Sequence, residues 1–248
     1  MHTVRTSLIR QNLHPDSEKL LNELINAFLF GAYTCKSMAY YFERDDIGMF
    51  GMADLNKWCA VHGFNDAKLV MDHITVRGGT VCFFDIKKPD RDDWGTPVDS
   101  LECLLTYKQT LYKLANKCHS SAHQFHDPHL NHFIETIILR PLVLFIRQCG
   151  ILISNMKRVG NGLGEYQLNK DLKCYLEELK CALPLQPTSF SRLNRRFSNR
   201  RNVFEEESSS SSESSSEEEE EDEEEVVPNR FSVKNVIPVV DKIINDLE

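Results

Sequence analysis

Apolar residues follow a helical pattern through the first 183 residues. After Asp16, the positions of one face are separated by three or four residues, as on one side of an α-helix: Leu20, Leu24, Phe28, Gly31, Cys35, Met38 and Phe42. Comparable series predict further helices over about 49–76, from Pro97 onward, over about 127–159 and over about 165–183. No segment alternates with a period of two, so the sequence predicts an all-α fold.

The segments between these helices indicate how they are connected. Arg77-Gly78-Gly79 ends the second helix, and the polar stretch Thr80–Thr96 separates it from the third. A four-helix bundle accommodates one such long crossover between helices that are otherwise joined by short loops. Pro141 falls within the fourth helix, where it has no N–H and its ring crowds the carbonyl of Ile137, so we expect a kink there.

Composition divides the rest of the chain into three segments. Residues 184–204 form a basic Ser/Arg linker, residues 205–225 hold 13 acidic side chains and no basic one, and residues 226–248 form a short apolar terminus. A Ser/Glu tract cannot bury enough apolar surface to offset the entropy of ordering it, so we expect a disordered acidic tail. The folded bundle domain is expected over residues 1–183.

Charge and cysteine usage exclude several classes of protein. The formal net charge is −8 and the basic excess is confined to Arg192–Arg201, which argues against direct nucleic-acid binding.

The longest apolar run, Pro141–Ile146, is far shorter than the ~20 residues of a membrane span. The start has no apolar signal-peptide core and the Cys form no C-x-x-C pair, so we expect a cytoplasmic protein with reduced thiols. Arg192–Arg201 is either a nuclear-import patch or a counter-charge for the acidic tract.

Several short segments match one family. They are Arg10-Gln11-Asn12, Asp16-Ser17-Glu18, Ser37–Phe42, Arg44-Asp45-Asp46, Arg77-Gly78-Gly79, Phe84–Pro89, Asp92-Asp93-Trp94, Asp127–Leu130 and Phe133–Thr136. From about Arg5 to Leu172 the chain resembles the eukaryotic ferritins. The resemblance implies a ferritin-like four-helix bundle with a long crossover and a short fifth helix. It also implies an octahedral cage of this chain and/or other ferritin subunits, surrounding a cavity in which iron is stored.

The resemblance also locates the di-iron site at which heavy ferritin subunits oxidise Fe(II). Hard iron ions need carboxylates and a His that converge from facing helices. The matching positions in this chain are Phe28, Cys35, Gly63, Asp66, Lys108 and Leu142. Because no ligand is retained, we expect no catalytic residue and no ferroxidase activity. The acidic cluster of light subunits is also replaced, at Trp58, Val61, His62 and Asn65.

Two further groupings involve charged and metal-ligating side chains. Asp66 and Lys108 both fall on inward faces, so we expect them to form a buried structural pair across the second and third helices. In the family, the positions matching His119, His132 and Glu135 line a three-fold channel through which Fe(II) enters. A retained cation path and a group of solvated histidines near a helix turn are both open interpretations.

Three functions from different classes are compatible with these residues. The first is an iron-storage shell subunit that binds iron, contributes to intracellular iron homeostasis and supplies cage structure instead of Fe(II) oxidation. The second is a repurposed bundle that acts as a non-iron scaffold and displays its acidic tail. The tail ends in a possible helix whose apolar face suits a protein partner: Val240, Ile243, Ile244 and Leu247. The third, a working ferroxidase, ranks last because its ligands are replaced.

Overall fold

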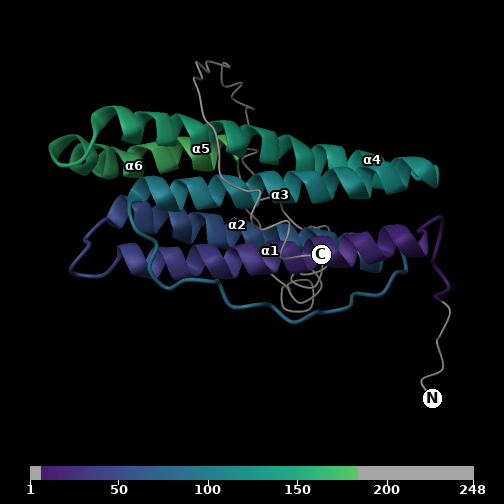
Figure 1. Ribbon diagram of the computed structural model, residues 1–248. Coiled ribbons are helices and arrows are strands. Elements are labelled where there is room, and N and C mark those ends of the chain that lie inside the picture. Colours follow the sequence, from purple (N-terminus) through teal and green to yellow (C-terminus); the bar gives the residue numbers. More distant parts are fainter. Residues whose placement is uncertain (1–6, 184–248) are drawn as a thin grey trace, which may run out of the picture. The chain divides into compact units, whose positions relative to one another are not determined.

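The computed structural model describes residues 7–183, and every regular element in that range is a helix (Figure 1). The elements are α1 (Pro15–Phe42), α2 (Phe50–Val76), α3 (Pro97–Gln124), α4 (Pro128–Phe133), η1 (Ile134–Leu139), α5 (Arg140–Val159) and α6 (Leu163–Ala182). Because α4, η1 and α5 are continuous, this part of the chain has four long helices and a shorter fifth, which confirms the predicted all-α class. The Ser/Arg linker with Arg192–Arg201, the acidic tract and the apolar terminus lie outside the described residues.

Local sequence explains where the helices begin. The side chain of His14 accepts a hydrogen bond from the backbone N–H of Asp16 at the start of α1. Thr96 and Asp99 form a reciprocal capping box at the start of α3, with Pro97 in its first turn. The side chain of Asp127 accepts from the N–H of Leu130 and caps α4. These caps account for the agreement between the expected and observed starts of α1, α3 and α4.

The first four long helices pack as an antiparallel bundle, with α1 against α2, and α3 against both α1 and α5 (Figure 1). The shorter α6 packs on α2 and α5. The crossover 77–96 runs back along α1 between the end of α2 and the start of α3 (Figure 1). Trp94 fastens it, since its ring is buried and its Nε1 donates to the Ser37 hydroxyl at 3.1 Å. Asn22 holds the other end through the Thr80 carbonyl and the Cys82 N–H.

The helix that contains Pro141 continues through the proline. A six-residue π-helical segment, η1, precedes it, and the N–H of Arg140 donates to the carbonyl of Glu135, five residues back. In an α-helix the Pro141 ring would crowd the carbonyl of Ile137. The wider turn changes the register between ring and carbonyls, so the proline is accommodated by a π-bulge instead of a break.

One expectation about this helix needs correction. Pro128–Val159 is long and apolar enough, by length and composition, to span a membrane, although its longest uninterrupted apolar run is short. A core helix of a bundle passes the same test. Leu142, Phe145, Cys149, Leu152 and Ile153 of this helix lie in the core, so we interpret it as a core helix.

Candidate functional site

The positions that match the family's di-iron site lie inside the bundle. Phe28 and Cys35 of α1, Lys108 of α3 and Leu142 of α5 are all buried, with Phe28 1% and Lys108 5% exposed. Gly63 of α2 faces α1 closely, because a Cβ added to it would lie 3.1 Å from the Cβ of Ala32. Sequence reasoning therefore placed these positions on the inward faces correctly.

Two aromatic rings lie near the ammonium of Lys108. Its Nζ lies 4.9 Å from the ring centre of Phe145 and 5.5 Å from that of Tyr107. Both distances fall within the range of cation–π attraction, which partly offsets the loss of hydration. The Tyr107 hydroxyl donates to the carbonyl of Ala27 at 3.1 Å, so this ring is held in place.

Asp66 is the one carboxyl among the matching positions. Its side chain is only partly exposed, and burial raises its pKa to about 6. The positive charge of Lys108 opposes part of this rise. The two groups therefore interact electrostatically, but no hydrogen bond or direct ion pair between them is present in the described residues. The structural pair Asp66–Lys108 stays a prediction.

Thiols are the second feature of this interior, and only Cys35 is among the positions that match the di-iron site. Cys35 of α1 and Cys59 of α2 are both buried, each 2% exposed. The neighbouring Cys59 and the charge of Lys108 lower the pKa of Cys35, whereas burial raises the pKa of Cys59 well above its ordinary value. Cys149 of α5 is also buried, and its pKa is raised to about 12. The available signal was spacing, because Cys59 precedes Gly63 by one helical turn.

This donor set differs from that of a di-iron site. Across residues 7–183, no group of three or more His, Cys, Asp or Glu side chains is positioned to hold a metal ion. The six matching positions instead offer one thiol, one ammonium and a single carboxyl. Iron prefers oxygen and imidazole ligands, and such ligands are scarce here.

The residues that match the family's three-fold channel are partly brought together. His119 Nε2 lies 2.7 Å from Glu135 Oε1, so α3 and η1 contribute one contact. His132 contacts the hydroxyl of Thr136, which lies 3.4 Å from its Nδ1. The channel itself is formed between subunits in the family, so a cation path stays a prediction.

Three of the four positions that match the acidic cluster of light subunits carry aromatic or apolar side chains on α2, and the fourth is Asn65. Trp58 lies beside His62, with ring centres 4.0 Å apart and the rings tilted, and it stacks against Phe145. Burial and the charge of Lys108 lower the pKa of His62 to about 4, so its imidazole is neutral at pH 7. Val61 is exposed on the same helix.

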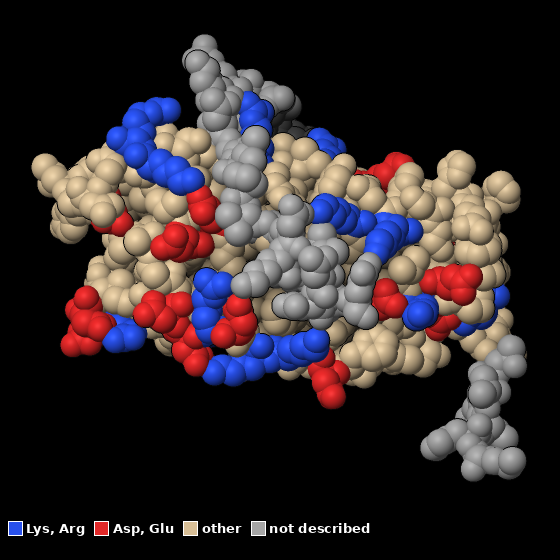
Figure 2. Space-filling model, viewed as in Figure 1, with Lys and Arg blue, Asp and Glu red and all other residues tan. Residues whose placement is uncertain are grey.

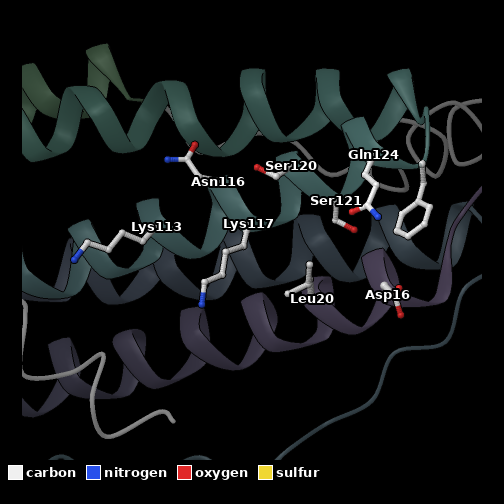
Figure 3. A pocket seen from close by; sticks show the side chains of 9 residues that line it. Asp16, Leu20, Lys113, Asn116, Lys117, Ser120, Ser121 and Gln124 are labelled. Carbon is white, nitrogen blue, oxygen red and sulfur yellow. The ribbon is translucent and has the colours of Figure 1, made fainter.

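A shallow groove between α1 and α3 lies outside all of these positions (Figure 3). It is lined by Asp16, Leu20, Lys113, Asn116, Lys117, Ser120, Ser121, Gln124 and Phe125. Across the face shown in Figure 2, Lys and Arg side chains are interspersed with Asp and Glu. The charged residues that line the groove are Lys113, Lys117 and Asp16, so it is not a strongly basic surface of the kind that binds nucleic acids.

Comparisons with known proteins agree with this architecture. The family model described as Ferritin-like domain matches residues 18–159. The middle subunit of ferritin from Aquarana catesbeiana is 36% identical over 167 residues, which are 66% of this chain and 95% of the relative. Soma ferritin from Lymnaea stagnalis is 36% identical over 165 residues, again 66% of this chain and 95% of the relative. Both relatives are matched over nearly their whole length.

Proposed function

This chain belongs to the ferritin family, and from that premise we propose that it is an iron-storage shell subunit that does not itself oxidise Fe(II). One observation supports the lack of oxidation. The six positions matching the di-iron site carry two large apolar side chains, a glycine, a thiol, an ammonium and only one carboxyl. They bring no imidazole and too few oxygens for two hard cations.

Electrostatics argues in the same direction. An Fe(II) ion in this interior would lie near the buried ammonium of Lys108, with Asp66 as the single carboxyl among the matching positions. In surroundings of low dielectric, repulsion between like charges is much stronger than in water. Lys108 thus disfavours the cation that the family's site attracts.

In this proposal the chain assembles with itself and/or with other ferritin subunits in an octahedral cage, and iron is its cargo. Oxidation of Fe(II) is then supplied by active partner subunits. His119 and Glu135, which are in contact, are the described groups best placed to meet an entering cation.

The test mixes the purified full chain with Fe(II) in air-saturated buffer and follows ferric absorbance and dioxygen uptake. We expect oxidation at the rate of buffer alone. In cages co-assembled with an active heavy-type subunit, the initial rate should scale with the fraction of that subunit. A fast phase that saturates at two irons per chain in the pure protein would refute the proposal.

Native mass of the same preparation tests the shell role separately. A large cage that retains iron after gel filtration is the expected result. A monomer or dimer without iron would favour the scaffold function instead, even if oxidation is absent.

A further inference from the structure

A buried histidine lies where the end of α2 meets α4. His73 of α2 is 8% exposed, and its Nε2 is enclosed without a hydrogen-bond partner among the described residues. Its ring stacks on that of Phe133, with ring centres 4.1 Å apart, and on that of His129, with ring centres 5.1 Å apart. Phe133 and His129 both belong to α4, so the imidazole of His73 is a packed contact between the two helices.

An ion pair ties the same two helices together. Arg77, the C-cap of α2, donates from Nη1 and Nη2 to the carboxylate of Asp127, over 3.2 and 2.9 Å. Asp127 is the N-cap of α4 and also accepts from the N–H of Leu130. Arg77 donates further to the carbonyl of Gln11, so one guanidinium joins three segments of the chain. The side chains of the pair are only 12% and 3% exposed, so salt in the solvent screens their attraction little.

The hydrogen bonds of this cluster suit neutral imidazoles. His129 Nδ1 lies 3.3 Å from Arg77 Nη1, and this contact is a hydrogen bond only when Nδ1 carries no proton, because arginine has no acceptor atom. A proton on His73 Nε2 would find no acceptor, since both oxygens of Asp127 are already bonded. One guanidinium and one carboxylate balance each other here. An added proton therefore leaves a buried positive charge without a partner, which is costly.

We propose that His73, His129, Arg77 and Asp127 form an acid-sensitive latch, which holds α4 on the end of α2 while the imidazoles are neutral and releases it when they take up protons. The ionisable side chains that act on His73 are the other three members of the latch. Burial, together with His129 and Arg77, lowers the pKa of His73 to about 4, whereas Asp127 acts in the opposite direction. Opening exposes the ring to water and returns its pKa toward 6.5, so acid favours the open state.

Release of α4 also affects the helix that follows it. α4 continues directly into η1, whose Glu135 contacts His119 of α3 at 2.7 Å. Opening of the latch therefore loosens the support of this contact in acid. The latch lies within a single chain and is independent of iron storage, so its failure would leave the shell function untouched.

The first experiment measures amide hydrogen exchange of the full chain by mass spectrometry at pH 7.5 and pH 5, and it needs no substitution. Opening is linked to proton uptake between pH 6.5 and about 4, so His73 alone should raise the opening equilibrium about 30-fold between these two conditions. After correction for the intrinsic pH dependence of exchange, residues 127–133 should show this rise and residues 50–60, at the other end of α2, should not. No rise at 127–133, or an equal rise in both segments, would overturn the proposal.

The second experiment attributes the rise to His73. His73→Leu keeps an apolar contact with α4 and removes the titrating group, so the rise at residues 127–133 should be at least about fivefold smaller than in the wild type. His73→Gln gives the same comparison through a polar side chain if the leucine variant does not fold. His123→Leu removes an exposed histidine in the last turn of α3 and is the matched control, which should retain the full rise. A rise of wild-type size in a folded His73 variant would refute the latch.

Discussion

Asp66→Asn should make the protein more stable at neutral pH. Asn has nearly the same shape as a protonated Asp, so the change removes the charge and little else. In the native protein the carboxyl is largely enclosed, and burial raises its pKa from 3.8 to about 6 despite the nearby ammonium of Lys108. The ionised form is therefore less stable inside the bundle than in the unfolded chain.

The magnitude follows from the shift. A rise of about 2 pKa units, at about 1.4 kcal/mol per unit, gives a penalty of about 3 kcal/mol when the carboxyl is ionised in both states. Between pH 3.8 and about 6 the folded state binds more protons than the unfolded state, so stability from this group falls as the pH rises. The full destabilisation by ionised Asp66 applies once the pH exceeds its folded-state pKa of about 6. At pH 4 it amounts to only about 0.5 kcal/mol.

The assay compares wild type and Asp66→Asn by urea and thermal unfolding at pH 7.5, 5 and 4. At pH 7.5 we expect the variant to melt roughly 6–12 °C higher, which corresponds to about 3 kcal/mol in a bundle of this size. Burial lowers the pKa values of His62 and His73 to about 4. These two groups therefore make the protein less stable as the pH falls, which is the opposite trend to that of Asp66. They are present in both proteins, so they cancel in the difference.

A control on the same helix separates this effect from a general loss of negative charge. Asp54 is exposed, and Asp54→Asn should change stability by less than about 0.5 kcal/mol at any of these pH values. Two results would refute the reasoning: Asp66→Asn destabilises the protein at pH 7.5, or its effect does not shrink between pH 7.5 and 4. Either would mean that the ionised carboxyl does not destabilise the folded state.

Two other predictions concern pairs of side chains that interact inside the bundle. Lys108→Met should raise the pKa of Asp66 further, so it should destabilise more at pH 8 than at pH 5 in urea unfolding; equal losses at both would contradict the coupling. The hydroxyls of Ser17 and Ser121 are hydrogen-bonded at 2.8 Å in a buried position. Ser17→Ala should cost about 1–3 kcal/mol, because a buried hydroxyl loses its partner, and the double change should cost less than the sum of the two single ones.

The helices were predictable because their determinants are local. Apolar spacing identified the buried faces, and Thr96 with Asp99 and Asp127 with Leu130 fix helix starts through residues three positions apart. The inward positions of Asp66 and Lys108 follow from the same periodicity. Their direct ion pair does not, because a Lys side chain has a long reach and here its ammonium lies among aromatic rings.

The rest of the site depends on how helices approach each other. Periodicity does not specify the close packing of α1 on α2, where a Cβ added to Gly63 would lie 3.1 Å from the Cβ of Ala32. The π-bulge before Pro141 is likewise a compromise between a local clash and the packing on both sides of it. The crossover has a mainly polar sequence, but its Trp94 is buried. This one aromatic ring anchors a stretch of otherwise exposed residues.

The anchoring of Trp94 gives the protein two distinguishable optical probes. The chain has two tryptophans: Trp94 reports on the docking of the crossover, and Trp58, beside Phe145, reports on the meeting of α2 and α5. Replacing either by Phe leaves an emission spectrum from a single place. If the crossover detaches before the helices separate, the Trp94 emission will shift to the red at lower denaturant than that of Trp58. Fluorescence would then resolve the order in which the bundle comes apart.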